Sequence, residues 1–102
     1  MVYGTGPVRT EDIRKRRKQI LKIARRHGAM NIRVFGLDPP EEAGPDSPVH
    51  FLVRAGRKTT PWFPGGLVAD LGDLLGCRVL VATESGLNES YRKEVLSDAV
   101  PV

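Results

Sequence analysis

The sequence contains a single cysteine, Cys77, so no disulfide can form within one chain. Structural disulfides belong to oxidising compartments, and a lone thiol therefore favours a reducing, cytoplasmic setting. No stretch approaches the roughly 20 apolar residues of a membrane span. The first ten residues, MVYGTGPVRT, also lack the apolar run of a signal peptide. We therefore expect a cytoplasmic protein with no membrane segment.

The length of 102 residues favours one domain. At this size roughly two-thirds of the unfolded surface can be buried, which allows a real but modest core. Residues 1–9 hold two glycines and a proline without a periodic apolar pattern. We expect them to form a flexible tail and residues 10–102 to form the domain.

Apolar periodicity and helix-ending residues predict alternating helices and strands. Thr10 precedes two acidic residues and resembles a helix cap, and Gly28 ends a helix that we expect over residues 11–27. The expected strands cover residues 31–35, 49–54 and 78–82. A second helix carries the leucines of residues 67–75, and a third is capped by Asn88 or Ser90 and ended by Pro101. This α-β-loop-β-α-β-α order predicts an α/β (α+β) fold with a mixed sheet of about three to four strands and helices mainly on one side.

Positive charge is concentrated in one segment of the chain. Residues 9–26 hold nine Lys and Arg against two acidic residues, whereas the remainder has seven basic and ten acidic residues. This basic first helix is either a solvated outer face or an electrostatic surface for nucleic acid or an acidic partner. No aromatic residue interleaves with its charges, so any nucleic-acid binding should be nonspecific and salt-sensitive.

Five residues are candidates for contacts with a partner. Three are basic residues of the first helix, Arg14, Arg17 and Lys18. The other two are the aromatic pair Trp62 and Phe63, which lie in a polar loop and form either a packed lid or exposed anchors.

The remaining histidines and the cysteine have simple structural interpretations. His27 lies at a helix end, where a cation suits the helix dipole. His50 adjoins an apolar run and is more often a hydrogen-bonded structural residue than a ligand. Cys77 has no Cys or His at metal-ligand spacing, so a buried, inert thiol is expected.

The predicted order and several short motifs together resemble the minimal nucleotidyltransferases of the polymerase-beta-like superfamily, over about residues 13–102. Ile32-Arg33-Val34-Phe35-Gly36 is similar to the Val-Arg-Val-Phe-Gly of the family. Pro45-Asp46-Ser47 resembles the Pro-Asp-Ser that precedes its first catalytic aspartate. Residues 70–76 and 78–84 resemble its leucine-rich helix and third strand.

The resemblance implies an active site whose decisive residues are replaced here. In such enzymes strand aspartates hold two divalent metals, normally magnesium, which clamp the nucleotide phosphates. Leu37 stands where a serine follows Gly36, and Pro48, His50 and Leu80 stand where the aspartates belong. Magnesium requires oxygen ligands, whereas the nitrogen of His50 suits zinc or nickel. We therefore expect a degenerate nucleotide site with no catalytic residue, no metal and no nucleotide cofactor.

The loop between the first two strands offers other carboxylates, at Asp38, Glu41, Glu42 and Asp46. Loop carboxylates are more often solvated than metal-bound, so a rescued metal site is the less favoured interpretation. The resemblance instead implies a catalytically inactive protein that acts by binding, as the antitoxin partner of a HEPN-type toxin.

Two alternatives remain open at the level of the sequence. One is an active transferase that uses magnesium and a nucleoside triphosphate to modify protein or RNA. The other is a nonspecific nucleic-acid-binding or structural subunit that uses the basic first helix. The sequence leaves the oligomeric state open, and a homo-oligomer is one of the options.

Overall fold

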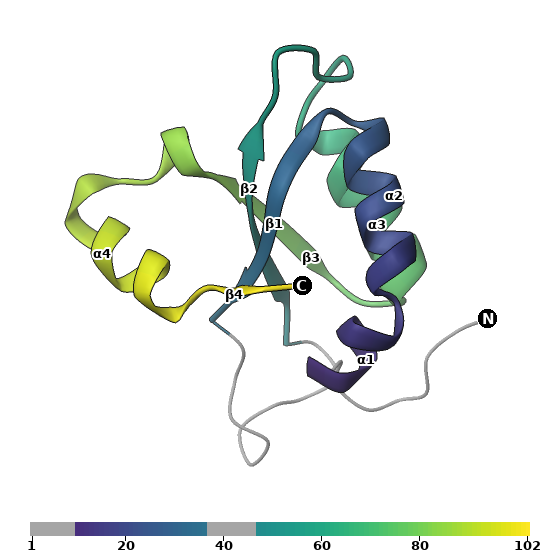
Figure 1. Ribbon diagram of the computed structural model, residues 1–102, viewed down its shortest axis with the longest axis horizontal. Helices are drawn as coiled ribbons and strands as arrows, with labels where there is room; N and C mark the ends of the chain where they lie inside the picture. The colour runs from purple at the N-terminus through teal and green to yellow at the C-terminus, as the bar shows by residue number, and fades with distance from the viewer. Residues whose placement is uncertain (1–9, 37–46) are drawn as a thin grey trace.

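A computed structural model describes residues 10–36 and 47–102 (Figure 1). The expected tail, residues 1–9, lies outside the described residues. So do residues 37–46, which include Leu37 and the four loop carboxylates. Within the described part of the chain, no helix is long and apolar enough to cross a membrane.

The described chain forms a four-stranded mixed sheet with helices on both sides (Figure 1). The elements in chain order are α1 (Thr10–Lys15), α2 (Arg17–Arg26), β1 (Ala29–Phe35), β2 (Val49–Ala55), α3 (Gly65–Leu75), β3 (Val79–Thr83), the 3₁₀ turn η1 (Glu84–Gly86), α4 (Glu89–Asp98) and β4 (Val100–Pro101). The strand order is β3-β2-β1-β4. β2 and β3 are parallel, whereas β1 is antiparallel to both of its neighbours. The predicted fold class is confirmed.

The helix expected over residues 11–27 is in fact two helices that meet at Arg16. The Arg16 N–H is shared between the carbonyls of Asp12 at 3.3 Å and Ile13 at 3.1 Å, which tightens the turn. Both short helices place an isoleucine in the core, with Ile13 2% and Ile20 0% exposed. The apolar spacing predicted which side of the helix is buried, but the break at Arg16 depends on packing.

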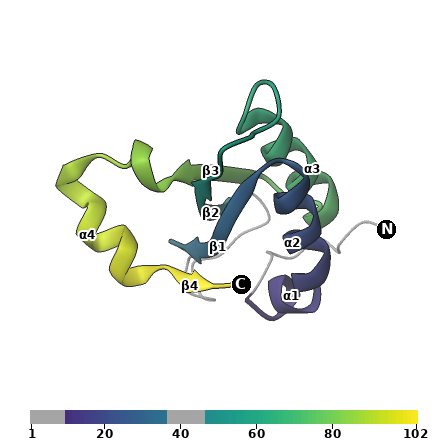
Figure 2. The same cartoon turned by 45° about the horizontal axis from the view of Figure 1, so that its top comes forward.

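The main core lies between one face of the sheet and the α2–α3 pair. Its larger buried members are Ile13, Ile20, Ile23, Ile32, Val34, Val49, Phe51, Val53, Leu67, Leu71, Leu75 and Val79. Burying a side chain of this size contributes roughly 1.5–3 kcal/mol before entropy is counted, so this layer is the principal source of stability. α4 lies on the other side of the sheet (Figure 2). The expectation of helices mainly on one side therefore holds for α1, α2 and α3.

Helix-ending and capping residues in the sequence predicted several helix ends correctly. Gly28 and Gly76 both follow helices and have left-handed φ angles of +82° and +65°, a region that glycine adopts without strain. Asn88, rather than Ser90, caps α4, since its Oδ1 accepts the Ser90 N–H at 3.0 Å. β4 was not predicted, because a two-residue strand has no readable pattern and exists only through its pairing with β1.

Candidate functional site

The sheet face that points away from α2 and α3 carries the replaced positions. Phe35 is the direct partner of His50, and His50 is the direct partner of Leu80, across three adjacent strands. Residues paired in this way project from the same face, so the three side chains form one row. The Phe35 and His50 rings lie with centroids 5.3 Å apart and a tilt of 51°. Leu80 is 39% exposed at the β3 end of the row.

Pro48 and Gly36 flank this row. Pro48 immediately precedes β2, two residues before His50, and is partly buried. Gly36 follows β1 with φ +63°, and a Cβ built on it would lie 3.8 Å from Cδ2 of the His50 ring. The fold therefore gathers Gly36, Pro48, His50 and Leu80 at one end of the sheet face.

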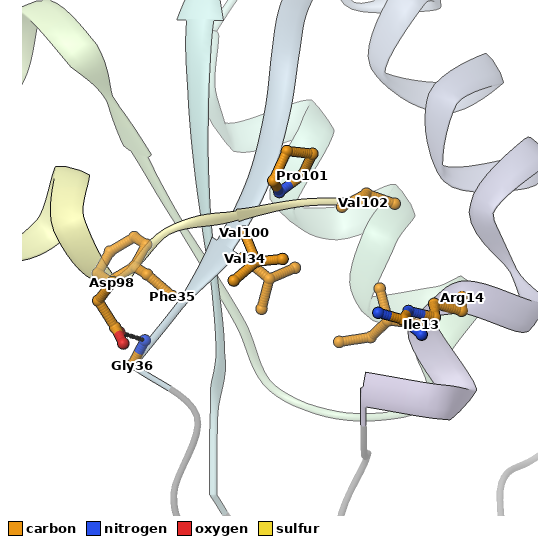
Figure 3. Close-up of a pocket in the computed structure, with 9 residues that line it drawn as sticks. All are labelled: Ile13, Arg14, Val34, Phe35, Gly36, Asp98, Val100, Pro101 and Val102. Atoms are coloured by element: carbon orange, nitrogen blue, oxygen red, sulfur yellow. Dashed lines mark hydrogen bonds between the residues drawn. The ribbon is translucent and has the colours of Figure 1, made fainter.

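A carboxylate from α4 binds the backbone at Gly36. Oδ2 of Asp98 accepts the Gly36 N–H at 2.7 Å (Figure 3). Beside this contact lies a pocket of about 220 Å³. Its lining is mostly apolar and consists of Ile13, Arg14, Val34, Phe35, Gly36, Asp98, Val100, Pro101 and Val102. The backbone amide of Gly36 is thus already hydrogen-bonded to a carboxylate of the same chain.

A second hollow next to the first is acidic. It has a volume of about 370 Å³ and is lined by Phe35, Glu94, Val95 and Asp98. Glu94 and Asp98 lie four residues apart, so they share one side of α4. Two carboxylate side chains therefore lie close to the turn at Gly36.

Glu84, another acidic residue on this side of the sheet, forms an ion pair with Arg33. Nη2 of Arg33 lies 2.9 Å from Oε2 of Glu84, and Asn31 donates to the same oxygen at 3.3 Å. The Arg33 side chain is 15% exposed, and its Nε and Nη2 make no well-directed hydrogen bond, so the contact is an ion pair. Arg33 is paired with Leu52, which is fully buried but is not part of the α2–α3 core cluster. Leu52 is therefore a buried apolar residue on the α4 side of the sheet.

The strand positions do not fit the two magnesium ions that the resemblance implies. Pro48, His50 and Leu80 offer one nitrogen donor and no side-chain oxygen, whereas magnesium requires oxygen ligands. Among residues 10–36 and 47–102, no three His, Cys, Asp or Glu side chains are grouped as metal ligands. The loop carboxylates lie outside that range.

The candidate partner residues separate into different environments. Arg14, Arg17 and Lys18 are all exposed, and Arg17 donates from Nε to the Val102 carbonyl at 2.9 Å. Trp62 is 91% exposed, whereas Phe63 is partly buried and packs against the core. The aromatic pair therefore combines one packed residue and one exposed residue.

His27 proved to be more than a partner of the helix dipole. It is 8% exposed, with Nε2 2.6 Å from Oδ2 of Asp70 and Nδ1 2.7 Å from Oγ1 of Thr60. These contacts tie the end of α2 to α3 and to the loop before it. Sequence reasoning missed them because the partners are 33 and 43 residues away. Cys77 is partly buried, and burial raises the pKa of its thiol, which favours the unreactive protonated form.

The mixed sheet and its flanking helices have the architecture of a nucleotidyltransferase-like α/β protein. No family model matches the chain, and no curated protein matches it. A solved structure of a protein proposed to be a minimal nucleotidyltransferase is 38% identical, with a TM-score of 0.76. The similarity covers 90% of this chain and 94% of that chain. The chain therefore belongs to the minimal nucleotidyltransferase family, which confirms the resemblance.

Proposed function

We propose that this member of the minimal nucleotidyltransferase family acts by binding a protein partner and does not transfer nucleotides. The observation that carries the proposal is the row of Phe35, His50 and Leu80, with Pro48 before it, on the face where the family places its carboxylates. Because Pro48, His50 and Leu80 offer no oxygen ligand, these positions cannot hold the metal ions that would neutralise the phosphates and activate the attacking group.

The charge around Gly36 supports the same proposal. In an active relative the turn after β1 would face a triphosphate. Here the Asp98 carboxylate accepts the hydrogen bond of the Gly36 N–H, and Glu94 adds a second negative charge nearby. A triphosphate would have to displace one carboxylate and approach another without compensating metal ions. Nucleotide binding at this site should therefore be weak.

The partner proposed from the family is a HEPN-type toxin, neutralised by formation of a complex in a reducing, cytoplasmic setting. Such a role requires an intact folded surface but no metals. The exposed basic residues Arg14 and Lys18 provide cationic contact points on α1 and α2. An acidic patch on the toxin would complement them.

A transfer assay tests the absence of catalysis. The protein is incubated with magnesium and each labelled nucleoside triphosphate, with a HEPN-domain protein and with RNA as acceptors. We expect no label on either acceptor. Transfer that is lost on Asp46→Asn would refute the proposal, because it would show that loop carboxylates rescue the metal site.

Calorimetry with ATP and magnesium tests the nucleotide site separately. We expect little or no heat of binding by the wild-type protein. Asp98→Asn keeps the shape of the side chain but removes its negative charge, so any residual affinity should increase. Tight ATP binding that is unaffected by Asp98→Asn would show that Asp98 does not oppose nucleotide binding.

Copurification tests the partner. We expect a nucleotide-independent complex with a HEPN-domain protein encoded beside this chain, and relief of its toxicity on coexpression. Arg14→Glu/Lys18→Glu should weaken the complex. The control is Lys93→Glu, which also reverses an exposed positive charge but on α4, and it should leave the complex intact. A toxin that binds both variants equally would exclude the basic helix as the contact surface. Failure to bind a HEPN protein would contradict the partner and leave the transfer assay as an independent test of inactivity.

A further inference from the structure

One end of the sheet gathers basic residues from three separate segments. It lies at the opposite end from Gly36, where α2 turns into β1 and where β2 runs into the loop before α3 (Figure 1). The basic residues there are all exposed and consist of Arg25 and Arg26 of α2, Arg54 of β2, and Arg57 and Lys58 of the loop. We call these five residues, together with Trp62, the distal surface.

Backbone contacts hold these segments against one another. The Gly56 N–H donates to the Gly28 carbonyl at 2.8 Å, and the Thr60 N–H donates to the His27 carbonyl at 3.3 Å. A Cβ on Gly28 would lie 2.0 Å from the Lys58 carbonyl oxygen, so the two backbones are in direct contact. The neighbouring carboxylate of Asp70 is taken up by His27. The loop cations are therefore fixed beside the end of the basic α2.

The same loop presents a single aromatic side chain. Trp62 is 91% exposed and has a φ of +65°, which is uncommon for a residue with a side chain. Its carbonyl accepts the Gly65 N–H at 2.6 Å, and the Phe63 N–H donates to the Thr60 carbonyl at 3.1 Å. With Phe63 packed on the core, the turn is anchored and the indole faces solvent.

We infer that the distal surface binds single-stranded nucleic acid, with a base stacked on Trp62 and the backbone phosphates on the flanking cations. Cationic grooves with exposed aromatic platforms are the usual means of binding single strands without sequence preference. A duplex keeps its bases stacked on one another and offers no free base to the indole. The net positive charge of the distal surface favours a polyanion, and the exposed indole adds a stacking surface for an unpaired base.

The sequence alone did not show this arrangement, because no aromatic residue interleaves with the charges of the basic helix. The fold brings Trp62 to the end of that helix through the loop contacts of Gly28 and Thr60. The inference does not depend on a toxin partner or on the state of the nucleotide site, since the distal surface lies at the other end of the sheet.

The single tryptophan of the chain makes the test direct. The full-length protein is titrated with a single-stranded oligouridylate of about 12 nucleotides and with a duplex of equal length, at low and at moderate salt. We expect the single strand to bind more tightly and to quench the fluorescence of Trp62. Anisotropy of a labelled strand measures the affinity of the variants. Trp62→Ala should weaken binding about 5- to 150-fold, the range typical of one lost stacking contact. Trp62→Phe should retain most of the affinity.

Charge variants supply the matched control. Arg57→Gln/Lys58→Gln should reduce the slope of log affinity against log salt by about 1.4, from roughly 0.7 per phosphate contact in single strands. Lys15→Gln/Lys93→Gln removes the same charge from α1 and α4 and should leave that slope nearly unchanged. Because all these side chains are exposed, circular dichroism should show folded variants.

Three results would overturn the inference. The first is that the single strand does not bind at low salt. The second is that it binds without quenching the fluorescence and with an affinity that Trp62→Ala does not change. The third is that the duplex or polyglutamate quenches the fluorescence as strongly as the single strand does. The last result would identify the distal surface as a site for polyanions in general or for an acidic protein.

Discussion

Replacing His27 by alanine removes the side chain that links α2, α3 and the loop between β2 and α3. The ring is 8% exposed and makes polar contacts of 2.6 Å to Asp70 and 2.7 Å to Thr60. One neutral tautomer satisfies both contacts, because Nε2–H donates to the carboxylate while Nδ1 accepts the hydroxyl proton. Replacement by alanine therefore breaks both contacts at once.

The expected cost follows from the two bonds and their exposure. A hydrogen bond to a charged group contributes roughly 1.5–3 kcal/mol and a neutral one roughly 1 kcal/mol. The Asp70 side chain is 42% exposed, so its carboxylate regains water in the variant and the cost lies toward the lower end. We expect His27→Ala to lower the free energy of unfolding by about 2–3 kcal/mol, out of the roughly 5–15 kcal/mol typical of a domain.

Urea denaturation followed by far-UV circular dichroism measures this change. Asp70→Asn keeps an acceptor oxygen and Thr60→Val keeps the shape of the side chain, so each should cost about 1 kcal/mol. His50→Ala is the control, because that ring is partly buried against Phe35 on the other face of the sheet. A His27→Ala cost no larger than that of His50→Ala would refute the linking role of His27.

Three further predictions test the backbone, the α4 side and the thiol. Gly28→Ala should lower the melting temperature by roughly 8 °C or more, because a left-handed residue with a Cβ 2.0 Å from the Lys58 carbonyl must displace the loop. Gly65→Ala, whose Cβ would meet nothing within 4 Å, should change the melting temperature little, and equal shifts for the two variants would contradict the packing. Leu52→Ala should cost about 2–5 kcal/mol in urea unfolding, whereas Leu80→Ala, at a 39% exposed position, should cost less than about 1 kcal/mol. Finally, burial raises the pKa of the Cys77 thiol above the ordinary 9.0, so its contribution to stability is complete below that pH and is lost as the pH rises through the folded-state pKa. Unfolding measured against pH should show this loss, and an identical profile for Cys77→Ser would exclude Cys77 as its source.

The helices and strands were largely predictable because their signals are local. Gly28 and Gly76 end helices in left-handed conformations, and Asn88 caps α4. The break at Arg16 and the strand β4 were not predictable in the same way. The first depends on how α1 packs on the core, and the second on pairing with β1.

The candidate site shows the same division. The family resemblance singled out His50 and Leu80, and the strand register places them in one row with Phe35. Asp98 had no signal in the sequence, because it meets Gly36 across 62 residues. Similarly, no local pattern pairs Glu84 with Arg33, since that ion pair depends on how β1 and η1 approach in space.

The amino-acid sequence by itself determined which side chains stand at the strand positions singled out by the family resemblance. A proline, a histidine and a leucine at positions 48, 50 and 80 provide no oxygen ligand, whatever the details of the fold. Only the tertiary structure decided which groups surround those positions. It brings the Asp98 carboxylate to the Gly36 amide, and it holds the loop that carries Trp62 against the end of α2 at the other end of the sheet. Such juxtapositions arise from long-range packing and strand register, and no short stretch of sequence encodes them.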